Sequence, residues 1–445
     1  MDKIEQALLR TTDTKRLLLG SGVLEKVPAM FADLFAGQTA LVVADAHTWR
    51  IAGERIDTLL RAAGIPVETP FIFTDPDLYA EWGYLEELEV RLRDTPAIPV
   101  AVGSGVINDL TKLASGHLGR KYMVVGTAAS MDGYTAYGAS ITFEGNKQTF
   151  SCPAPYGMVL DGNIAAKAPA GMSASGYADL IAKVPAAADW MLADAVAAEK
   201  IDSFSYALVQ DGLKETLAAP DRIAAGDSAA TAKLAEGLIM SGFAMQALQS
   251  SRPASGLEHQ FSHYWDMDNL CYRGKHVSHG FKVGIGTLVS TACLEFLLET
   301  DLPAIDAQAC AAAWPTLPQL ETRIRALFAG KSGHLSRALV ETRDKYVDAE
   351  GVFRQIRDLQ AAWPGLKARI RAQLYPFDEL KEKLRAVGAP YEPEMIGVSR
   401  ERLRDTFRRI PYMRSRFTCI DVLQRCGLLE EMEHRLFGPG GHWEV

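Results

Sequence analysis

The first part of the chain alternates between short apolar runs and stretches whose apolar residues have helical spacing. Four runs have the length and composition of buried strands: 39–44, 66–73, 98–102 and 122–125. Between them, the stretches 49–63 and 85–92 place apolar residues three or four positions apart, as amphipathic helices do. Such alternation predicts a mostly parallel sheet covered by helices. We therefore expect a Rossmann-like α/β domain over residues 1–165.

The pattern changes after about residue 165, where Ala- and Leu-rich stretches replace the strand signals. Helices are predicted over 176–217, 228–250, 281–300 and 318–330. The tail, 352–436, also has a helical pattern and is rich in Arg. These stretches predict an all-α C-terminal domain over residues 166–445.

Length and composition agree with two domains of an ordinary globular protein. A chain of 445 residues is too long for one core, and 48% hydrophobic with 23% charged residues is typical of globular proteins. The net charge of −8 argues against nonspecific nucleic-acid binding. No nucleic-acid partner is expected.

The sequence contains few features that indicate a cellular compartment. The segment 1–6 is charged and lacks the apolar stretch of a signal peptide, and no apolar run is expected to span a bilayer. The six cysteines are scattered and form no Cys-x-x-Cys pair, so we predict reduced thiols and neither disulfides nor a zinc finger. A cytoplasmic protein without a membrane partner is expected.

The best clue to chemistry is a cluster of histidines. Four of the nine lie in one short stretch: His259, His263, His276 and His279. Ser255 and Glu258 have the spacing of a capping box, which predicts a helix with His259 and His263 on one face. Paired imidazoles on one surface suit a transition-metal site or an acid/base site.

One acidic residue lies in an apolar, helix-like stretch and completes a ligand set. Asp179 with His259 and His279 would form a site of two histidines and one carboxylate with open positions, which suits zinc, nickel or iron. Alternatively, Asp179 pairs with Lys183 one helical turn later, and each histidine is an ordinary core or surface residue. Spacing alone does not decide which histidines bind.

A glycine-containing turn follows the strand 98–102 and opens a helix. Its residues are Gly103, Ser104, Gly105, Val106 and Ile107. Glycines let a backbone approach a pyrophosphate, and the free N–H groups of a helix start bind its charge. Asn108 occupies the position of a third glycine, so a tight turn without a ligand is the alternative.

Two other predicted strands end in polar residues. Asp45 could hydrogen-bond the ribose of an adenosine, or it could cap a helix. After the strand 122–125 come Thr127, Ala128, Ala129 and Ser130, followed by Asp132. Their hydroxyls and carboxylate suit a phosphate-rich cofactor and a polyol, although a simple polar turn is the alternative.

Two further patterns concern packing and charge. Gly284 and Gly286 lie within a predicted helix, where glycine lowers stability, and so indicate a close approach of backbones. One stretch of the tail is crowded with arginines: Arg402, Arg404, Arg408, Arg409, Arg414 and Arg416. This arginine-rich stretch could form a phosphate site, a subunit interface or a solvated face, and the sequence does not decide among these three roles.

In this order, these motifs resemble the sn-glycerol-1-phosphate dehydrogenase family, within the superfamily of metal-dependent glycerol dehydrogenases and dehydroquinate synthases. The resemblance runs from about residue 13 to 429. It rests on three strings: 251–263, which includes Ser-Arg-Pro-Ala-Ser-Gly and Glu-His; 127–133; and 412–418, Tyr-Met-Arg-Ser-Arg-Phe-Thr.

The resemblance implies a metal- and NAD- or NADP-dependent enzyme that reduces dihydroxyacetone phosphate to sn-glycerol-1-phosphate. It implies one divalent metal bound by Asp179, His259 and His279. Zinc is the first candidate for this metal, and nickel and iron are the alternatives. The dinucleotide would lie on 103–107 and 127–130, while Asp132 and His263 contact the substrate and Asp179 lies near both substrate and metal. A homo-oligomer acting on a small phosphorylated substrate is expected. The alternatives are a dehydroquinate synthase-like cyclase that uses NAD transiently, and a dehydrogenase of another polyol or polyol phosphate.

The chain departs from the family pattern at several positions. Ala178 replaces a usual glycine, Ala182 and Ala136 replace serines, and Ser104 replaces a middle glycine. The gap from His259 to His279 is longer than expected, through residues 264–272. Because this insertion follows a predicted ligand, it bears on which substrate is used.

Overall fold

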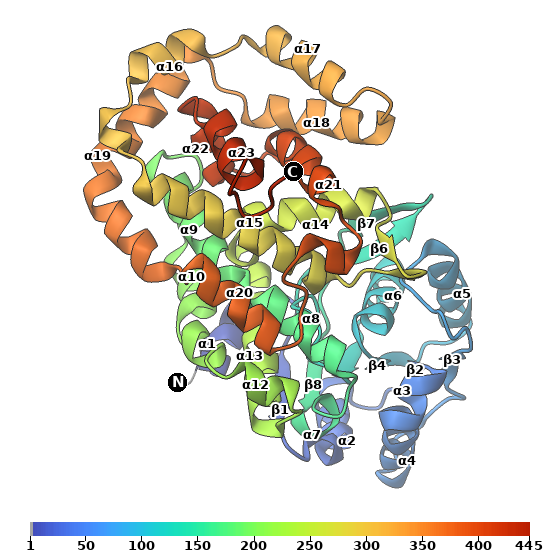
Figure 1. Cartoon of the computed structure of the whole chain (residues 1–445). Coiled ribbons are helices and arrows are strands. Elements are labelled where there is room, and N and C mark those ends of the chain that lie inside the picture. Colours follow the sequence, from blue (N-terminus) through green and yellow to red (C-terminus); the bar gives the residue numbers. More distant parts are fainter. Residues whose placement is uncertain (1–2) are drawn as a thin grey trace. The chain divides into compact units, whose positions relative to one another are not determined.

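The computed structural model describes residues 3–445 (Figure 1). The chain divides into two compact units. The first unit comprises Met1–Leu180, Phe204–Ala254 and Ala386–Ala389. The second comprises Ile181–Ser203, Ser255–Arg385 and Pro390–Val445.

The first unit is built on a six-stranded parallel sheet with strand order β1-β8-β5-β4-β2-β3. Its strands are β1 (Arg16–Gly20), β2 (Ala40–Asp45), β3 (Phe71–Phe73), β4 (Ile98–Gly103), β5 (Met123–Gly126) and β8 (Gly157–Asp161). The central strands β4, β5 and β8 are buried along their whole length, which explains their continuous apolar sequences. The predicted α/β class with a mostly parallel sheet is confirmed.

Helices and one hairpin complete this unit. The helical segments are α1 (Lys3–Arg10), η1 (Val23–Lys26), α2 (Val27–Leu34), α3 (Ala46–Thr48), η2 (Trp49–Gly53), α4 (Glu54–Ala62), α5 (Trp82–Arg93), α6 (Gly105–His117), α7 (Gly162–Ala165), α8 (Ala170–Ile181), α10 (Ser203–Gln210), α11 (Leu213–Thr216), α12 (Pro220–Ala224), α13 (Ser228–Leu248) and η3 (Arg252–Ala254). The hairpin pairs β6 (Ala139–Phe143) with β7 (Asn146–Phe150). Val27, Phe31, Val42, Val100 and Val125 belong to the core beneath the sheet.

The second unit is helical, as predicted. Its helical segments are α9 (Lys183–Ala195), α14 (Leu257–Met267), α15 (His279–Glu299), η4 (Leu302–Ala304), α16 (Ala307–Ala313), α17 (Leu317–Leu327), α18 (Ser332–Lys345), α19 (Ala349–Gln373), α20 (Phe377–Ala386), η5 (Pro393–Ile396), α21 (Arg400–Arg409), η6 (Ile410–Tyr412), α22 (Cys419–Arg425) and α23 (Leu429–Phe437). A short hairpin joins α14 to α15 through β9 (Cys271–Tyr272) and β10 (Lys275–His276).

The prediction of one helix over 176–217 is wrong, because the chain forms α8, α9, α10 and α11 there. After α9, Ala197 adopts a left-handed φ of 53°, and Gly212 does so (φ 79°) before α11. The Asp194 carboxylate accepts a hydrogen bond from the N–H of Ile201 at 3.0 Å and stabilises the bend. Ala-rich periodicity does not mark such ends, since Ala is favourable in any helix.

The expectation that no segment could span a bilayer needs correction. By length and composition, α15 could do so, but 89% of its most apolar window is buried inside the protein. Within its unit, α15 packs against α14, α9, α22 and α23. An interior helix surrounded by other helices is apolar all round for this reason.

Candidate active site

The two predicted cofactor segments begin at paired positions of neighbouring strands. Gly103 at the end of β4 is the register partner of Gly126 at the end of β5, and the N–H of Thr127 donates to the Gly103 carbonyl at 3.1 Å. The segments 103–107 and 127–130 therefore leave the same edge of the sheet side by side. In open α/β sheets, this carboxyl edge is where ligands bind.

The turn after β4 is closely packed and opens α6 without a side-chain cap. A Cβ atom on Gly103 would lie 2.6 Å from the Ile107 side chain, and one on Gly105 would lie 2.9 Å from Cε of Met131. Ser104 is the N-cap residue but makes no capping hydrogen bond, and the first turn carries no acidic residue. The first N–H groups of α6 and its dipole therefore suit an anion such as a pyrophosphate.

Asn108, at the third glycine position, belongs to the core. Its side chain is buried, and its Oδ1 accepts a hydrogen bond from the Tyr122 hydroxyl at 3.0 Å. The turn thus resembles a dinucleotide-binding turn only over its first three residues.

At the end of β2, Asp45 caps a helix. Its Oδ1 accepts hydrogen bonds from the N–H groups of His47 and Thr48, both at 2.8 Å, and Thr48 Oγ1 accepts from the N–H of Asp45 at 3.1 Å. This is the capping alternative weighed above. Contact with a ribose stays a prediction.

The loop after β5 links the cofactor segment to the predicted substrate residue. The N–H of Asp132 donates to Asp179 Oδ2 at 3.0 Å, and Ser241 Oγ on α13 donates to Asp132 Oδ2 at 3.0 Å. The Tyr134 hydroxyl donates to the Ala128 carbonyl at 2.9 Å. Asp132 and Asp179 are both buried, so their carboxylates are held in defined positions.

A buried lysine that the sequence did not single out shapes the same loop. Lys112 of α6 is 1% exposed, and its Nζ donates to the carbonyls of Gly133 (2.7 Å), Ala136 (2.9 Å) and Gly138 (3.1 Å). Burial lowers the pKa of Lys112, and Asp109, 3.9 Å away, opposes this effect. One side chain therefore connects the helix of the glycine turn to the loop of Asp132.

Three of the four clustered histidines lie together. The ring centroids of His259 on α14 and His279 at the start of α15 are 5.3 Å apart, and that of His263 is 6.4 Å from each. His276 lies on the exposed hairpin, where its Nδ1 is 3.5 Å from Cys271 Sγ. The predicted helical face of His259 and His263 is confirmed.

The two helices that carry these rings are in backbone contact. A Cβ atom on Gly286 of α15 would lie 2.3 Å from the Glu258 carbonyl oxygen on α14. The close approach predicted from the glycines is confirmed at Gly286. The helix contact brings His259 and His279 together.

The start of α14 differs from the predicted capping box. The N-cap is Gly256, whose N–H donates to Glu258 Oε1 at 2.5 Å, while the Ser255 carbonyl accepts from Arg416 at 3.0 Å. Buried Asp189 of α9 fixes this start, because its Oδ2 accepts from the N–H of Leu257 at 2.8 Å. The capping-box prediction is wrong because charged partners distant in sequence take the place of the local cap.

Each histidine predicted as a ligand is oriented through its Nδ1. Glu258 Oε1 lies 2.8 Å from His259 Nδ1, and Ser262 Oγ lies 3.2 Å from His279 Nδ1. Metal-bound histidines usually use one ring nitrogen for the ion and the other for such a partner. Sequence reasoning missed both partners, although Glu258 directly precedes His259 and Ser262 follows it by three positions.

Within the second unit, His259 and His279 present two imidazoles side by side, and in the first unit Asp179 offers the buried carboxylate that the sequence predicts as the third ligand. A carboxylate and two imidazoles are a donor set for zinc, nickel or iron. The buried carboxylate and the Nδ1 partners of both rings fit a bound divalent cation.

His263 is in a positively charged environment. Burial lowers its pKa well below the ordinary value, and the charges of Arg414, the two neighbouring histidines and Arg337 act in the same direction. A neutral imidazole at neutral pH can accept a proton.

Comparison with known proteins shows which sequences and folds the chain is similar to. The sequence profile of the iron-containing alcohol dehydrogenase family matches residues 18–169. The fold is similar to glycerol dehydrogenase from Schizosaccharomyces pombe (TM-score 0.60, 17% identity, 95% of this chain and 91% of that chain). It is also similar to maleylacetate reductase from Agrobacterium tumefaciens (TM-score 0.58, 16% identity, 95% and 96%). These likenesses show that the chain has the fold of those two solved structures.

The relatives found by sequence similarity indicate a narrower family than the fold does. Glycerol-1-phosphate dehydrogenase (NAD(P)+) of Halalkalibacterium halodurans is 35% identical over 253 residues, 56% of this chain and 63% of that one. The Bacillus velezensis protein of the same name is 33% identical over 293 residues, which are 63% of this chain and 73% of that one. The Bacillus licheniformis protein of the same name is 26% identical over 427 residues, which are 96% of this chain and 92% of that one. The chain belongs to the glycerol-1-phosphate dehydrogenase family.

Proposed function

We propose that the protein is an NAD(P)-dependent dehydrogenase that interconverts dihydroxyacetone phosphate and sn-glycerol-1-phosphate. The observation that carries the proposal is the pair of neighbouring imidazoles of His259 and His279, with the Nδ1 atoms of both rings held by Glu258 and Ser262. The family relatives carry the name of this activity. The reaction moves a hydride between the nicotinamide and C2 of the three-carbon substrate.

Asp179, His259 and His279 would hold one divalent metal, zinc first, with nickel or iron as alternatives. Such an ion supplies Lewis-acid polarisation of the substrate oxygen. Glu258 and Ser262 keep the two rings in the tautomer and orientation that ligation requires.

The dinucleotide would lie on the carboxyl edge of the sheet. Residues 103–107, with the N–H groups of α6, would bind the pyrophosphate, and 127–130 would line the same edge. Asp45, at the end of β2, would favour NAD over NADP, because its carboxylate repels a 2′-phosphate.

Asp132 and His263 would contact the substrate. Asp132 is positioned by Ser241 and through its own N–H by Asp179, so its carboxylate can orient a substrate hydroxyl. His263, whose pKa is lowered, is suited to accept the proton when the alcohol is oxidised, and the same proton is returned in reduction. We place the enzyme in the cytoplasm.

The test is absorbance of the reduced nicotinamide with metal-replete protein, NADH or NADPH, and dihydroxyacetone phosphate. We expect loss of the signal that requires both metal and substrate and gives sn-glycerol-1-phosphate. Turnover of a substrate without net nicotinamide change would indicate the cyclase alternative. No turnover by protein shown to bind metal and cofactor would overturn the proposed substrate.

A further inference from the structure

Asp189 of α9 joins the starts of two helices that are far apart in the chain. Its Oδ2 accepts a hydrogen bond from the N–H of Leu257 at the start of α14, at 2.8 Å, and its Oδ1 accepts one from the N–H of Cys419 at the start of α22, at 2.7 Å. The side chain is fully buried. A buried carboxylate is costly unless its oxygens are hydrogen-bonded, and the N–H groups of helix starts are favourable partners for its charge. Asp189 therefore fixes the two helix starts relative to each other.

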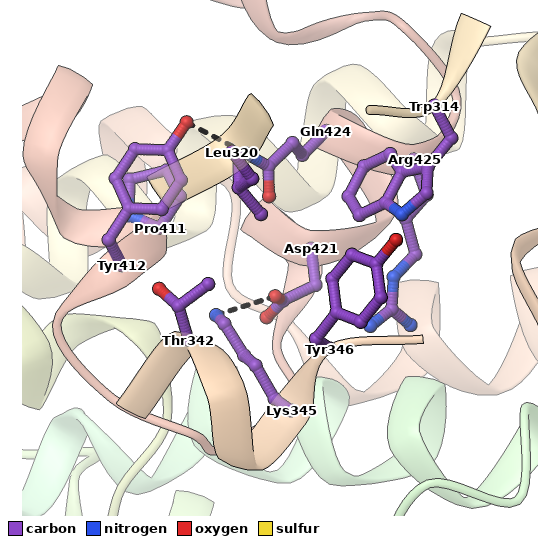
Figure 2. A pocket seen from close by; sticks show the side chains of 10 residues that line it. All are labelled: Trp314, Leu320, Thr342, Lys345, Tyr346, Pro411, Tyr412, Asp421, Gln424 and Arg425. Atoms are coloured by element: carbon purple, nitrogen blue, oxygen red, sulfur yellow. Dashed lines mark hydrogen bonds and ion pairs between the residues drawn. The ribbon is translucent and has the colours of Figure 1, made fainter. Parts of the chain in front are cut away.

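The start of α22 is anchored by a second set of contacts. Its N-cap residue, Thr418, donates its N–H to Asp421 Oδ2 at 2.9 Å. Asp421 Oδ1 in turn accepts a hydrogen bond from Lys345 Nζ of α18 at 2.7 Å, in the small pocket shown in Figure 2. Because α22 is held in this way, it presents its first N–H group to Asp189 from a defined position.

The start of α14 is also held by a second residue. Arg416 donates to the Ser255 carbonyl at 3.0 Å and also bonds the Ser255 hydroxyl, just before the N-cap residue Gly256. A Cβ atom on Gly256 would lie 2.5 Å from Asp189 Oδ2, so the carboxylate can approach only because this residue is glycine. Asp189 and Arg416 thus hold the backbone on both sides of Gly256, and the string 412–418 supplies one of the two contacts.

The start of α14 is connected to the predicted metal ligand His259 through Glu258. Glu258 Oε1 accepts the N–H of Gly256 at 2.5 Å and lies 2.8 Å from His259 Nδ1. Between Gly256 and Glu258, Leu257 has its N–H held by the carboxylate of Asp189. A change in the backbone at this point would therefore move the carboxylate that orients the imidazole, and outer partners of this kind set the affinity of a metal site.

We propose that Asp189, supported by Arg416, is a positioning residue of the metal site. It holds the start of α14 so that Glu258 keeps the imidazole of His259 in the orientation that ligation requires. Asp189 does not touch the metal in this role. The inference rests on the proposed function, since it names a residue on which metal binding at that site depends.

Asp189→Asn tests the proposal, because an amide keeps one acceptor oxygen but turns an N–H donor toward the other backbone N–H. Asp194→Asn on the same helix is the matched control, since it alters a comparable contact, the one with the N–H of Ile201 at 3.0 Å. Competition with a chelating dye would measure the affinity for zinc. We expect Asp189→Asn to weaken zinc binding about 10-fold, the lower end of the effect of removing an outer partner, and Asp194→Asn to leave it unchanged. Equal zinc affinity in the two variants would overturn the role of Asp189.

Nuclear magnetic resonance of the metal-free protein with isotope-labelled histidine gives a readout that needs neither metal nor turnover. In the wild type, the His259 signals should report the tautomer with its hydrogen on Nδ1, next to Glu258. Asp189→Asn should shift these signals or mix the two tautomers, while Asp194→Asn should leave them as in the wild type. Unchanged His259 signals in Asp189→Asn would contradict the proposal.

If Asp189→Asn does not fold, Arg416→Gln takes its place, because it removes the second contact at the same helix start. The same loss of zinc affinity is expected, and wild-type affinity would overturn the proposal. The two proposals fail separately. Equal zinc affinity in the variants of an enzyme that reduces dihydroxyacetone phosphate would overturn the role of Asp189 alone. A protein whose zinc binding depends on Asp189 but which does not reduce dihydroxyacetone phosphate would overturn the proposed function alone.

Discussion

The backbone N–H of Asp132 donates a 3.0 Å hydrogen bond to the carboxylate of Asp179. A residue predicted to contact substrate is thereby joined directly to a residue predicted to bind metal. Asp179→Asn keeps an oxygen that can accept this bond but removes the ligand charge. We expect a folded protein with strongly reduced metal content, measured by elemental analysis after dialysis. Wild-type metal content in this variant would show that Asp179 is not a ligand.

Glu258 orients His259 through a 2.8 Å contact with its Nδ1. Glu258→Gln should weaken metal affinity about 10- to 100-fold, the usual effect of removing such a partner. The affinity can be measured by competition with a chelating dye, and Glu350→Gln on the exposed start of α19 is the control. An unchanged affinity would mean that the contact does not support ligation.

Lys112 is the shared donor of three loop carbonyls. Lys112→Met leaves these buried acceptors without their partner, so we expect a loss of about 3 kcal/mol in the free energy of unfolding. Urea denaturation measures it, with Lys233→Met at an exposed position of α13 as the control. A loss no larger than that of the control would show that other donors hold the loop.

Gly286 allows α15 to touch the backbone of α14. Gly286→Ala places a methyl group 2.3 Å from the Glu258 carbonyl, so the helices must separate and the two histidines with them. We expect lower stability and lower metal affinity together. Gly333→Ala is the matched control, because a Cβ there meets nothing within 4 Å. Retention of metal affinity by Gly286→Ala would show that the histidines do not depend on this contact.

Burial also makes stability depend on pH. His334 on α18 is buried next to Tyr264, and burial lowers its pKa from the ordinary value of 6.5. Below that value the unfolded chain binds a proton that the folded protein does not, so the free energy of unfolding falls as pH falls toward the folded pKa. Urea denaturation between about pH 7.5 and pH 5 should show a smaller fall for His334→Gln than for wild type. Replacing exposed His47 should leave the fall unchanged.

Much of the fold was predictable from the sequence because its strands are buried on both faces. Runs such as 98–102 are apolar throughout and end in glycine, so both the sheet and its ligand-binding edge could be predicted. β1 was missed because Arg16–Gly20 is short and none of its residues is buried, and the buried strand β8 was not predicted either. The ends of α8 and α9 were missed because they depend on tertiary contacts.

The site was predictable where chemistry concentrates in one stretch, as at His259 and His263. The residues that support the site could not be predicted from the sequence. Lys112 is a lysine in a helical pattern, which normally indicates a solvated face, and only the loop folded over it shows its role. Asp189 likewise acts on an N–H distant in sequence. The roles of the arginines in the tail could not be assigned from the sequence, because they depend on partners distant in the chain, such as Asp268 for Arg402.

The contact at Gly286 has a consequence for the connection between the two histidine helices. Because the helices touch directly, the separation of His259 and His279 is independent of the number of residues that join them. The joining hairpin turns at Arg273 and Gly274, both with positive φ and both exposed. The long connection is therefore a natural place for evolution to add or delete residues, and for an engineer to insert a reporter or open new chain ends.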